Sequence, residues 1–162
     1  MKIIIEGPDG VGKTTLVKKL EKEYNLASMH LTKNDRTDFA FYSHLLNMDN
    51  IIFDRHFISE VIYPKVFNRK YQLDREKIRE LFAQAKTSNF LIFILIDSPE
   101  RILARLTDDE HPEVVEKTKF IATSYELIAT MFPQCYVIDL SKEDPYETVQ
   151  RIVQQNYRAG SL

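Results

Sequence analysis

The placement of glycine constrains this chain more than any other feature of its sequence. Of the four glycines among 162 residues, Gly7, Gly10 and Gly12 lie within six positions, directly after the apolar residues 3–5 and directly before an amphipathic stretch. Glycines allow a backbone to curl until successive N–H groups converge on phosphate oxygens. The segment Gly-Pro-Asp-Gly-Val-Gly-Lys-Thr therefore has the Walker A pattern, which predicts a strand, a phosphate-binding loop and a helix.

The polar residues of this loop have expected roles in holding a nucleotide. Lys13 is expected to reach the β- and γ-phosphates, and the Thr14 hydroxyl is expected to bind Mg²⁺ at the start of the helix. The predicted nucleotide-binding set is Gly7, Asp9, Gly10, Val11, Gly12, Lys13, Thr14 and Thr15. The pattern thus favours an enzyme that binds ATP or GTP over a tight turn with an incidental lysine.

Composition limits the class of protein and its partners. The length suits a single domain over residues 1–162, and the hydrophobic fraction of 44% is ordinary for a globular protein. The formal charge of −2 gives no strong field for nucleic acid or a membrane, so small-molecule partners are expected. No apolar segment approaches the length of a membrane-spanning helix, and we expect a cytoplasmic protein. The single cysteine, Cys135, excludes an internal disulfide and is expected to be buried.

Strand-like and helical patterns alternate along the chain. Continuous apolar runs are typical of strands buried on both faces of a parallel sheet, and the segments between them have helical periodicity. Strands are predicted at residues 2–6, 27–31, 50–54, 90–97 and 135–140. Helices are predicted at residues 13–24, 38–48, 57–68, 75–87, 99–106, 113–131 and 145–157. The expected fold is α/β, with a five-stranded parallel sheet between two layers of helices, as in P-loop NTPases.

A phosphate-binding loop needs a carboxylate at the end of a neighbouring strand to orient Mg²⁺. Asp54 and Asp97 both end apolar runs, but Asp97 precedes Ser-Pro-Glu, which is typical of the start of a helix. Asp54 is followed at once by Arg55, whose planar guanidinium can clamp a phosphate with two hydrogen bonds. We therefore assign the metal-side carboxylate to Asp54 and the phosphate clamp to Arg55, in preference to an exposed ion pair.

With these motifs in place, the chain resembles the thymidylate kinases and the wider group of deoxynucleoside and deoxynucleoside monophosphate kinases. The matching pieces are residues 5–15, Asp54-Arg55-His56 with Ser59 and Tyr63, Arg101 and Arg105 leading into Thr-Asp-Asp-Glu at 107–110, and Val-Ile-Asp-Leu-Ser at 137–141. The resemblance implies a nucleoside-monophosphate-kinase-like fold with a short lid at about residues 101–113. It also implies a homodimer, and a loop after the last strand, near residues 142–145, that covers the adenine of ATP.

The resemblance assigns further roles to individual residues. Asp9 would face the 3′-hydroxyl of the acceptor's deoxyribose, Arg55 would hold the acceptor phosphate and the transferred group, and Asp54 would serve the metal. Some relatives carry a basic residue where this chain has Gly10, and relatives without it place catalytic arginines in the lid. Gly10 thus points to Arg101 and Arg105, which would share one face of a helix.

The acceptor pocket is the part where the chain departs from that family. Thymidylate kinases carry a Thr-Arg-Glu-Pro-Gly segment after the second strand, but this chain reads Leu-Thr-Lys-Asn-Asp-Arg at 31–36. Lys33 or Arg36 would replace the missing arginine, unless both belong to a surface charge cluster. Tyr63, Phe41 and Arg69 are the other candidates for contact with the acceptor, and Phe39, Tyr42 and His44 are further candidates for stacking on its base. The aromatic residues also suit a packed core.

These observations predict transfer of a phosphoryl group from ATP, with Mg²⁺, to a deoxynucleoside monophosphate, with dTMP as the first candidate. A close alternative is a deoxynucleoside kinase with an uncharged acceptor such as thymidine, for which Asp54 or then Glu6 is the candidate base. A kinase of a modified nucleotide is a third possibility. A nucleotide-binding module without turnover is the alternative from another class.

Overall fold

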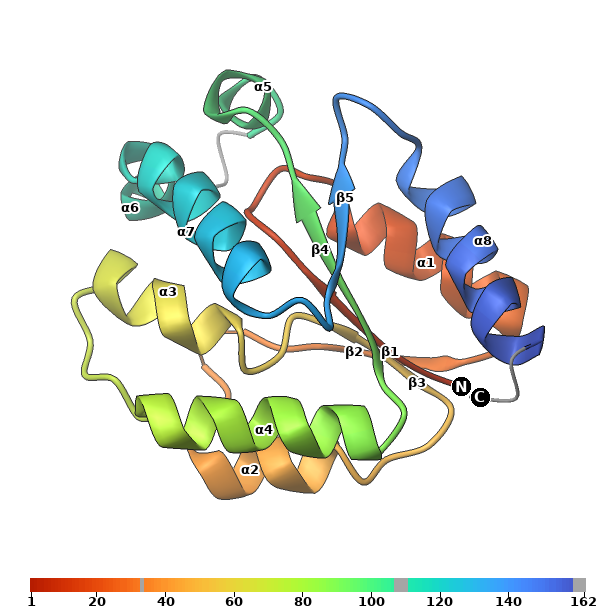
Figure 1. The fold of residues 1–162 in the computed structure, drawn as a ribbon. Coiled ribbons are helices and arrows are strands. Elements are labelled where there is room, and N and C mark those ends of the chain that lie inside the picture. Colours follow the sequence, from red (N-terminus) through yellow and green to blue (C-terminus); the bar gives the residue numbers. More distant parts are fainter. Residues whose placement is uncertain (33, 107–110, 159–162) are drawn as a thin grey trace.

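The central layer of the molecule is a parallel sheet. The computed structural model describes residues 1–32, 34–106 and 111–158, and its five strands lie in the order β2-β3-β1-β4-β5. The strands are β1 (Lys2–Glu6), β2 (Ala27–His30), β3 (Ile51–Asp54), β4 (Leu91–Ile96) and β5 (Tyr136–Asp139). All neighbouring strands pair in parallel, as the continuous apolar runs predict. The predicted α/β fold with a five-stranded parallel sheet is confirmed (Figure 1).

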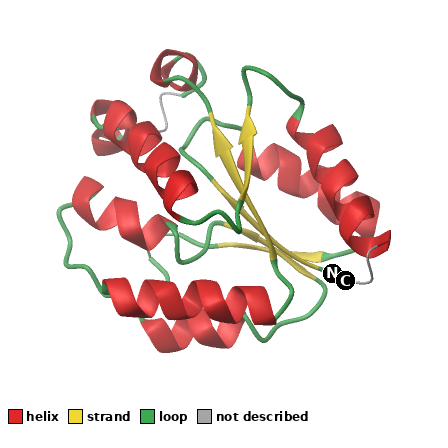
Figure 2. Cartoon of the chain, viewed as in Figure 1, coloured by secondary structure: helices red, strands yellow, loops and turns green. Residues whose placement is uncertain are grey.

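Helices cover both faces of this sheet, which Figure 2 shows in red on either side of the yellow strands. Helices α1 (Lys13–Tyr24) and α8 (Pro145–Arg158) pack on one face. The opposite face carries α2 (Phe39–Leu45), α3 (Ser59–Val66), α4 (Arg75–Thr87) and α7 (Thr118–Met131). Two short helices, α5 (Pro99–Leu103) and α6 (Pro112–Glu116), lie beyond the end of β4 (Figure 1).

The central strand β1 shows why the two faces have separate cores. Ile3 and Ile5 pack toward α1 and α8, whereas Ile4 packs toward α2, α3, α4 and α7. Successive residues of a strand point to opposite faces of the sheet, and helices cover both faces, so all three side chains are fully buried. This burial places Glu6, the last residue of β1, in the interior at the carboxyl edge of the sheet.

The helix predicted over residues 113–131 is wrong as a single element. The structure contains α6 and α7 instead, with a break at Lys117, whose φ is −102° and ψ is 14°. The Thr118 hydroxyl donates to the carbonyl oxygens of Val114 and Val115, both at 3.0 Å, and so offers that turn an alternative to regular helical bonds.

The helix predicted over residues 99–106 ends at Leu103. The N–H of Arg105 reaches back three residues to Ile102 at 2.9 Å, so the chain tightens into a turn there. Arg105 therefore lies beyond the helix on which it was expected. Other boundaries shift by a few residues. Within the described residues, no helix is both long enough and apolar enough to span a membrane.

Candidate active site

The loop between β1 and α1 has the conformation that phosphate binding requires. Gly12 adopts φ 83° and ψ 21°, a left-handed conformation that favours glycine, and α1 begins directly after it. The N–H groups of the first helical turn therefore face the loop, where they can bind an anion. Lys13 is buried, and its Nζ donates to the carbonyl oxygen of Pro8 at 2.5 Å. Thr14 and Thr15 are exposed at the helix start.

The environment of Lys13 lowers the pKa of its ammonium group to about 8. Burial is the largest cause, and the positive charge of Arg55 adds to it, whereas Asp9, Asp54 and Glu6 oppose it. Bound phosphates would supply the negative charge that restores an ordinary lysine pKa. The side chain is thus placed where an anionic ligand completes its surroundings.

The residues predicted for Mg²⁺ are brought together. The Thr14 Oγ1 donates to Asp54 Oδ2 at 2.6 Å, and His30 Nδ1 lies 3.0 Å from the same oxygen. Burial alone would raise the pKa of Asp54, but the hydrogen bonds from His30 and Thr14 and the charge of Lys13 lower it. The other oxygen, Oδ1, is buried without a hydrogen-bond partner among the described residues.

This donor set fits Mg²⁺ that is bound together with a nucleotide. A threonine hydroxyl and an ionised carboxylate are oxygen ligands of the kind that Mg²⁺ prefers, and the ion usually keeps several waters and binds substrate phosphates. Over the ranges that the structure covers, no three His, Cys, Asp or Glu side chains form a metal-binding group by themselves. A cation at Thr14 and Asp54 would therefore depend on the phosphates for its remaining ligands.

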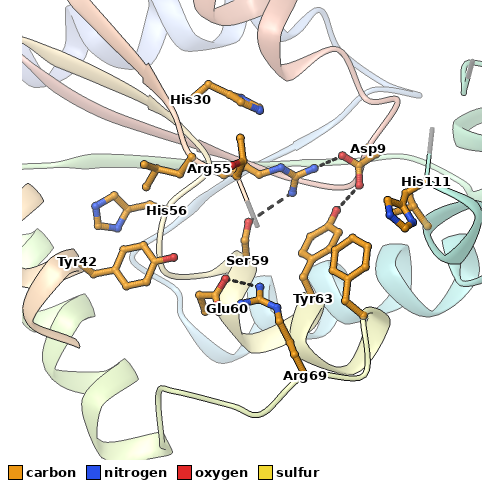
Figure 3. Close-up of a pocket in the computed structure, with 14 residues that line it drawn as sticks. Asp9, His30, Tyr42, Arg55, His56, Ser59, Glu60, Tyr63, Arg69 and His111 are labelled. Atoms are coloured by element: carbon orange, nitrogen blue, oxygen red, sulfur yellow. Dashed lines mark hydrogen bonds and ion pairs between the residues drawn. The ribbon is translucent and has the colours of Figure 1, made fainter. Parts of the chain in front are cut away.

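Arg55 connects the phosphate loop to the rest of the site. It leaves β3 with φ 73°, a conformation that residues with side chains rarely adopt, and its buried guanidinium turns back toward the loop (Figure 3). Its Nη2 pairs with Asp9 Oδ1, and the Tyr63 hydroxyl donates to Asp9 Oδ2 at 2.5 Å. Burial alone would raise the pKa of Asp9, but the charges of Arg55 and Lys13 and the Tyr63 hydrogen bond lower it.

A buried network behind Arg55 centres on Glu6. The Glu6 carboxylate accepts from the N–H of His56 at 2.7 Å, from the Ser59 hydroxyl at 2.8 Å and from the Tyr125 hydroxyl at 3.0 Å. Arg55 Nη1 lies 3.4 Å from both of those hydroxyl oxygens. The network couples β1 to α3 and α7. Sequence reasoning missed Tyr125, because nothing in the pattern of α7 separates it from the other core residues.

A cavity of about 280 Å³ extends from Asp9 and Arg55, beside the phosphate loop, to Glu60 and Arg69. Figure 3 shows Arg55 and Asp9 at one end and the ion pair between Glu60 and Arg69 at the other. The cavity is lined by Asp9, His30, Leu31, Thr32, Tyr42, Arg55, His56, Ser59, Glu60, Tyr63, Phe67, Arg69, His111 and Val114. Its position next to the loop makes it the candidate acceptor site.

The far end of the cavity carries a charged pair with unused hydrogen-bonding capacity. Arg69 Nη2 donates to Glu60 Oε1 at 2.7 Å. Within the described part of the chain, Glu60 Oε2 and Arg69 Nε are buried and have no partner. Burial raises the pKa of Glu60, and Arg69 opposes that shift. A ligand with one donor and one acceptor side by side would complete this pair.

Aromatic rings form the walls between the two ends. Tyr63 and Phe67 stack with their centroids 5.9 Å apart on one side, and Tyr42 lies on the other, 5.0 Å from the ring of His56. Burial lowers the pKa of His56 to about 3, and its ring nitrogens have no partner among the residues described, so it is neutral. The cavity thus has flat apolar walls and polar ends, which suits a planar ring with a polar edge.

Two of the predicted acceptor residues lie elsewhere. Of the two neighbouring candidates in α2, Tyr42 lines the cavity, whereas Phe41 packs edge-on against Tyr42 at 5.5 Å and does not line it. The two neighbours point to different sides of α2, and the sequence pattern did not say which side faces the ligand. Arg36 is exposed and pairs with Asp38 at 2.8 Å. Lys33 lies outside the described residues.

The predicted lid arginines meet at Asp97. Arg105 Nη2 lies 2.6 Å from Asp97 Oδ2, and Arg101 Nε lies 3.3 Å from Oδ1. The helix start predicted at Ser-Pro-Glu after Asp97 is confirmed, because the Ser98 hydroxyl caps α5 by accepting from the Arg101 N–H at 3.3 Å. Residues 107–110 of the predicted lid lie outside the described residues.

A second cavity, of about 390 Å³, lies on the outer side of the loop and suits the donor nucleotide. It is lined by Gly10, Val11, Gly12, Thr15, Leu16, Lys19, Arg105, Leu140, Glu143, Asp144, Pro145 and Tyr146. The segment after β5 therefore lies where a loop over the adenine was expected. Backbone and mixed side chains line this cavity, in contrast to the charged pairs of the first.

Comparison with known proteins places the chain in a family. The model of the ATPase family associated with various cellular activities (AAA) matches residues 3–122. A relative from Bacillus subtilis (strain 168), the SPbeta prophage-derived uncharacterized protein YorR, is 31% identical over 110 residues. That alignment covers 64% of this chain and 66% of the relative, slightly less than two thirds of its length. Since the family model spans most of the chain, the protein belongs to the AAA ATPase family.

Solved structures with a similar fold include nucleoside and nucleotide kinases. A crystal structure of YorR in complex with phosphorylated GDP has a TM-score of 0.84, with 21% identity over 98% of each chain. Deoxyadenosine kinase from M. mycoides with bound dCTP has a TM-score of 0.62 and 19% identity, over 98% of this chain and 100% of that one. Thymidylate kinase from Candida albicans has a TM-score of 0.59 and 16% identity, over 98% and 92% of the respective chains. The chain therefore has a P-loop kinase fold.

Proposed function

We propose that this AAA-family protein transfers the γ-phosphoryl group of ATP to a deoxynucleoside monophosphate, with dTMP as the first acceptor to test. One observation carries the proposal: Arg55, Asp9 and Tyr63 form a junction between the phosphate loop and the cavity beside it. A donor on the loop and an acceptor in the cavity would meet at this junction.

The residues at the junction have the chemistry that such a transfer needs. An oxygen of the acceptor phosphate forms a bond to the γ-phosphorus while the bond to the β,γ-bridging oxygen breaks, and ADP leaves. Lys13 and Arg55 carry the positive charge that holds the reacting phosphates in line. Asp9 is positioned to accept a hydrogen bond from the sugar. Mg²⁺, held by Thr14 and Asp54, would neutralise charge on the donor phosphates.

The state of the carboxylates favours a phosphate acceptor over a hydroxyl. A neutral hydroxyl would need a base, and the two candidates have other partners: Glu6 accepts from Ser59 and Tyr125, and Asp54, which accepts from Thr14, is the carboxylate proposed for Mg²⁺. A phosphate monoester is already ionised at neutral pH, so it needs positioning and counter-charge instead. Thymidine remains the matched alternative for the assay.

The far end of the cavity favours a nucleobase over an organic acid. The ion pair of Glu60 with Arg69 has no net charge, so it offers no excess positive charge to an acceptor that carries a carboxylate at that end. Glu60 Oε2 and Arg69 Nε match the adjacent N–H and carbonyl groups of thymine or guanine. Because the YorR structure holds phosphorylated GDP, guanine nucleotides join thymine nucleotides at the head of the panel.

The experiment is a measurement of ADP release from ATP and Mg²⁺ with dTMP, dGMP, dUMP, dCMP, dAMP and thymidine. Lys13→Ala is the inactive control, and the exposed neighbour variant Lys18→Ala controls for loss of a lysine. Turnover with one or more monophosphates supports the proposal. Turnover with thymidine alone would mean that the protein is a nucleoside kinase instead. No ADP release with any acceptor would favour a nucleotide-binding module without turnover.

A further inference from the structure

The carboxylate of Asp97 is an unexplained buried charge at the end of β4. Its side chain is 0% exposed, and its two oxygens face different arginines, Arg105 at 2.6 Å and Arg101 at 3.3 Å. Its Oδ1 also accepts from the Ser98 N–H at 2.9 Å. A buried carboxylate is stable only where positive charge and hydrogen bonds surround it. Asp97 thus holds two long, partly exposed arginine side chains in place.

The two arginines extend from Asp97 in different directions. Arg105 lines the donor-side cavity together with Gly10 and Gly12 of the phosphate loop. Arg101 Nη2 donates to the carbonyl oxygen of Leu140, directly after β5, at 3.3 Å. One arginine therefore faces the place of the donor nucleotide, and the other connects α5 to the sheet.

Gly10 of the phosphate loop lies directly against the segment that carries Arg105. A Cβ on Gly10 would lie 2.9 Å from Leu106 Cδ2 and 3.1 Å from the carbonyl oxygen of Ile102. The segment that carries Arg105 therefore packs directly on the loop backbone, and a side chain at position 10 would require Leu106 and Ile102 to shift. Position 10 itself carries no cation, and the segment packed against it brings Arg105 to the same cavity.

From this geometry we propose that Asp97 is a positioning residue that holds Arg105 against the phosphates of the donor nucleotide, with Arg101 as a brace. The inference rests on the proposed function, since it names the residue that orients a cation for phosphoryl transfer. It separates two arginines that the sequence treats alike: Arg105 contacts the nucleotide, and Arg101 supports the turn. Asp97 acts only through Arg105.

A double-mutant cycle on kcat tests this dependence. Arg105→Ala is expected to lower kcat about 100-fold or more, because a cation at the transferred group is lost. Asp97→Asn keeps the size of the side chain and is expected to lower kcat about 10-fold, with the KM of the acceptor unchanged. Arg101→Ala is expected to change kcat less than about threefold. Adding Asp97→Asn to Arg105→Ala should then cost nothing further, whereas independent effects would multiply.

A binding measurement separates failure of this inference from failure of the proposed function. Titration with a non-hydrolysable ATP analogue and Mg²⁺ needs no acceptor, so the same cycle can be read there if no acceptor is turned over. Loss of affinity in Arg105→Ala and Asp97→Asn, without further loss in the double variant, supports the inference. Multiplying losses, or stronger binding in Asp97→Asn because Arg105 is released from a parked position, would overturn it.

Variants that fold poorly do not decide the question by themselves. Circular dichroism and thermal unfolding accompany every variant. In Arg105→Ala the buried Asp97 carboxylate keeps Arg101 and the Ser98 N–H as partners, so this variant is expected to fold whether or not Asp97→Asn does. If Asp97→Asn does not fold, Arg105→Ala is compared with Arg101→Ala. Equal affinity of the two variants for the ATP analogue would contradict the proposal that only Arg105 contacts the nucleotide.

Discussion

The donor side and the acceptor side of this site are built in different ways. On the donor side, one continuous segment, residues 7–15, supplies the loop, the lysine and the threonines, and much of its work falls to backbone N–H groups. On the acceptor side, side chains from β2, α2, α3 and the segments around them converge on one cavity, and its polar ends are ion pairs. The phosphate-binding part of the donor side is thus a local structure, whereas the acceptor side depends on the whole fold.

This difference indicates that specificity for the acceptor depends on the acceptor side. Backbone groups bind any nucleoside triphosphate of the right length, so the donor loop constrains reaction class more than substrate. Buried side-chain pairs such as Glu60–Arg69 distinguish ligands by their hydrogen-bonding edges, because an unmatched partner leaves a buried polar group unpaired. Changes on the donor side should therefore affect all acceptors equally, and changes on the acceptor side should affect them unequally.

The largest effect is expected from removing Lys13. Lys13→Ala should lower kcat/KM about 10²- to 10³-fold with every acceptor, because a preorganised cation at the transferred phosphoryl group is lost. ADP release measured at saturating Mg²⁺ checks this. Lys18→Ala, on the exposed face of the same helix, should remain within about twofold of the parent. A loss in Lys13→Ala for only some acceptors would break the distinction between the two sides.

The next largest effect is a change of acceptor preference in Glu60→Gln. The glutamine keeps the shape but loses the charge and one acceptor, so the preferred monophosphate should lose roughly 10- to 100-fold in kcat/KM. The KM for ATP should stay constant. Ratios of kcat/KM across the panel give the measurement, and a uniform loss for all bases would mean that Glu60 only supports the fold.

The pH dependence of nucleotide binding should be smaller and confined to the donor side. Burial and Arg55 lower the pKa of Lys13 to about 8, so the free protein carries the Lys13 charge below pH 8 and loses it above. Because phosphates need the charged form, the affinity for an ATP analogue should fall by up to about tenfold for each pH unit above 8. Binding above pH 8 should therefore take up protons, as calorimetry in buffers of different ionisation enthalpy will show.

Lys13→Arg provides the control for this pH dependence. Arginine stays charged throughout the accessible range, so its affinity for the analogue should be independent of pH between 7 and 9. The same fall in affinity in the arginine variant would place the titrating group elsewhere.

The smallest effect expected is on stability, from two glycines of the loop. Gly10→Ala and Gly12→Ala both put a side chain at positive φ, 76° and 83°, at a cost of about 1–2 kcal/mol each. Only at Gly10 does the new Cβ meet neighbours, Leu106 and Ile102, whereas at Gly12 the structure places nothing within 4 Å among the residues it describes. Thermal unfolding should thus show the lower midpoint for Gly10→Ala. Equal midpoints would contradict the close packing of α5 on the loop.

The same difference between the two sides explains what could be predicted from the sequence. The strand, loop and helix around Gly12 followed from adjacent residues, and the β1 and α1 bounds agree with prediction. Asp54 and Thr14, 40 residues apart, could be paired because the ends of parallel strands share one edge of the sheet. The fold class followed from the alternation of apolar runs and amphipathic stretches.

The acceptor cavity could not be predicted to the same degree. The choice between Phe41 and Tyr42 depends on the rotation of α2, which adjacent aromatic residues do not reveal. The pairing of Glu60 with Arg69 depends on where α3 ends, because the chain turns back there through the bond from the Arg69 N–H to the Pro64 carbonyl at 2.8 Å. The role of Asp97 was hidden by the capping signal beside it.

The most direct test of the account is the binding of a compound in which the 5′-phosphate groups of adenosine and thymidine are joined by one chain of five phosphates. We expect the joined compound to bind at a single site per chain, with an affinity well above that of ATP or dTMP alone. It would occupy both cavities and pass Arg55 at their junction. Arg55→Ala should remove most of that gain. An affinity for the joined compound no greater than that for ATP would contradict the claim that donor and acceptor meet at this junction.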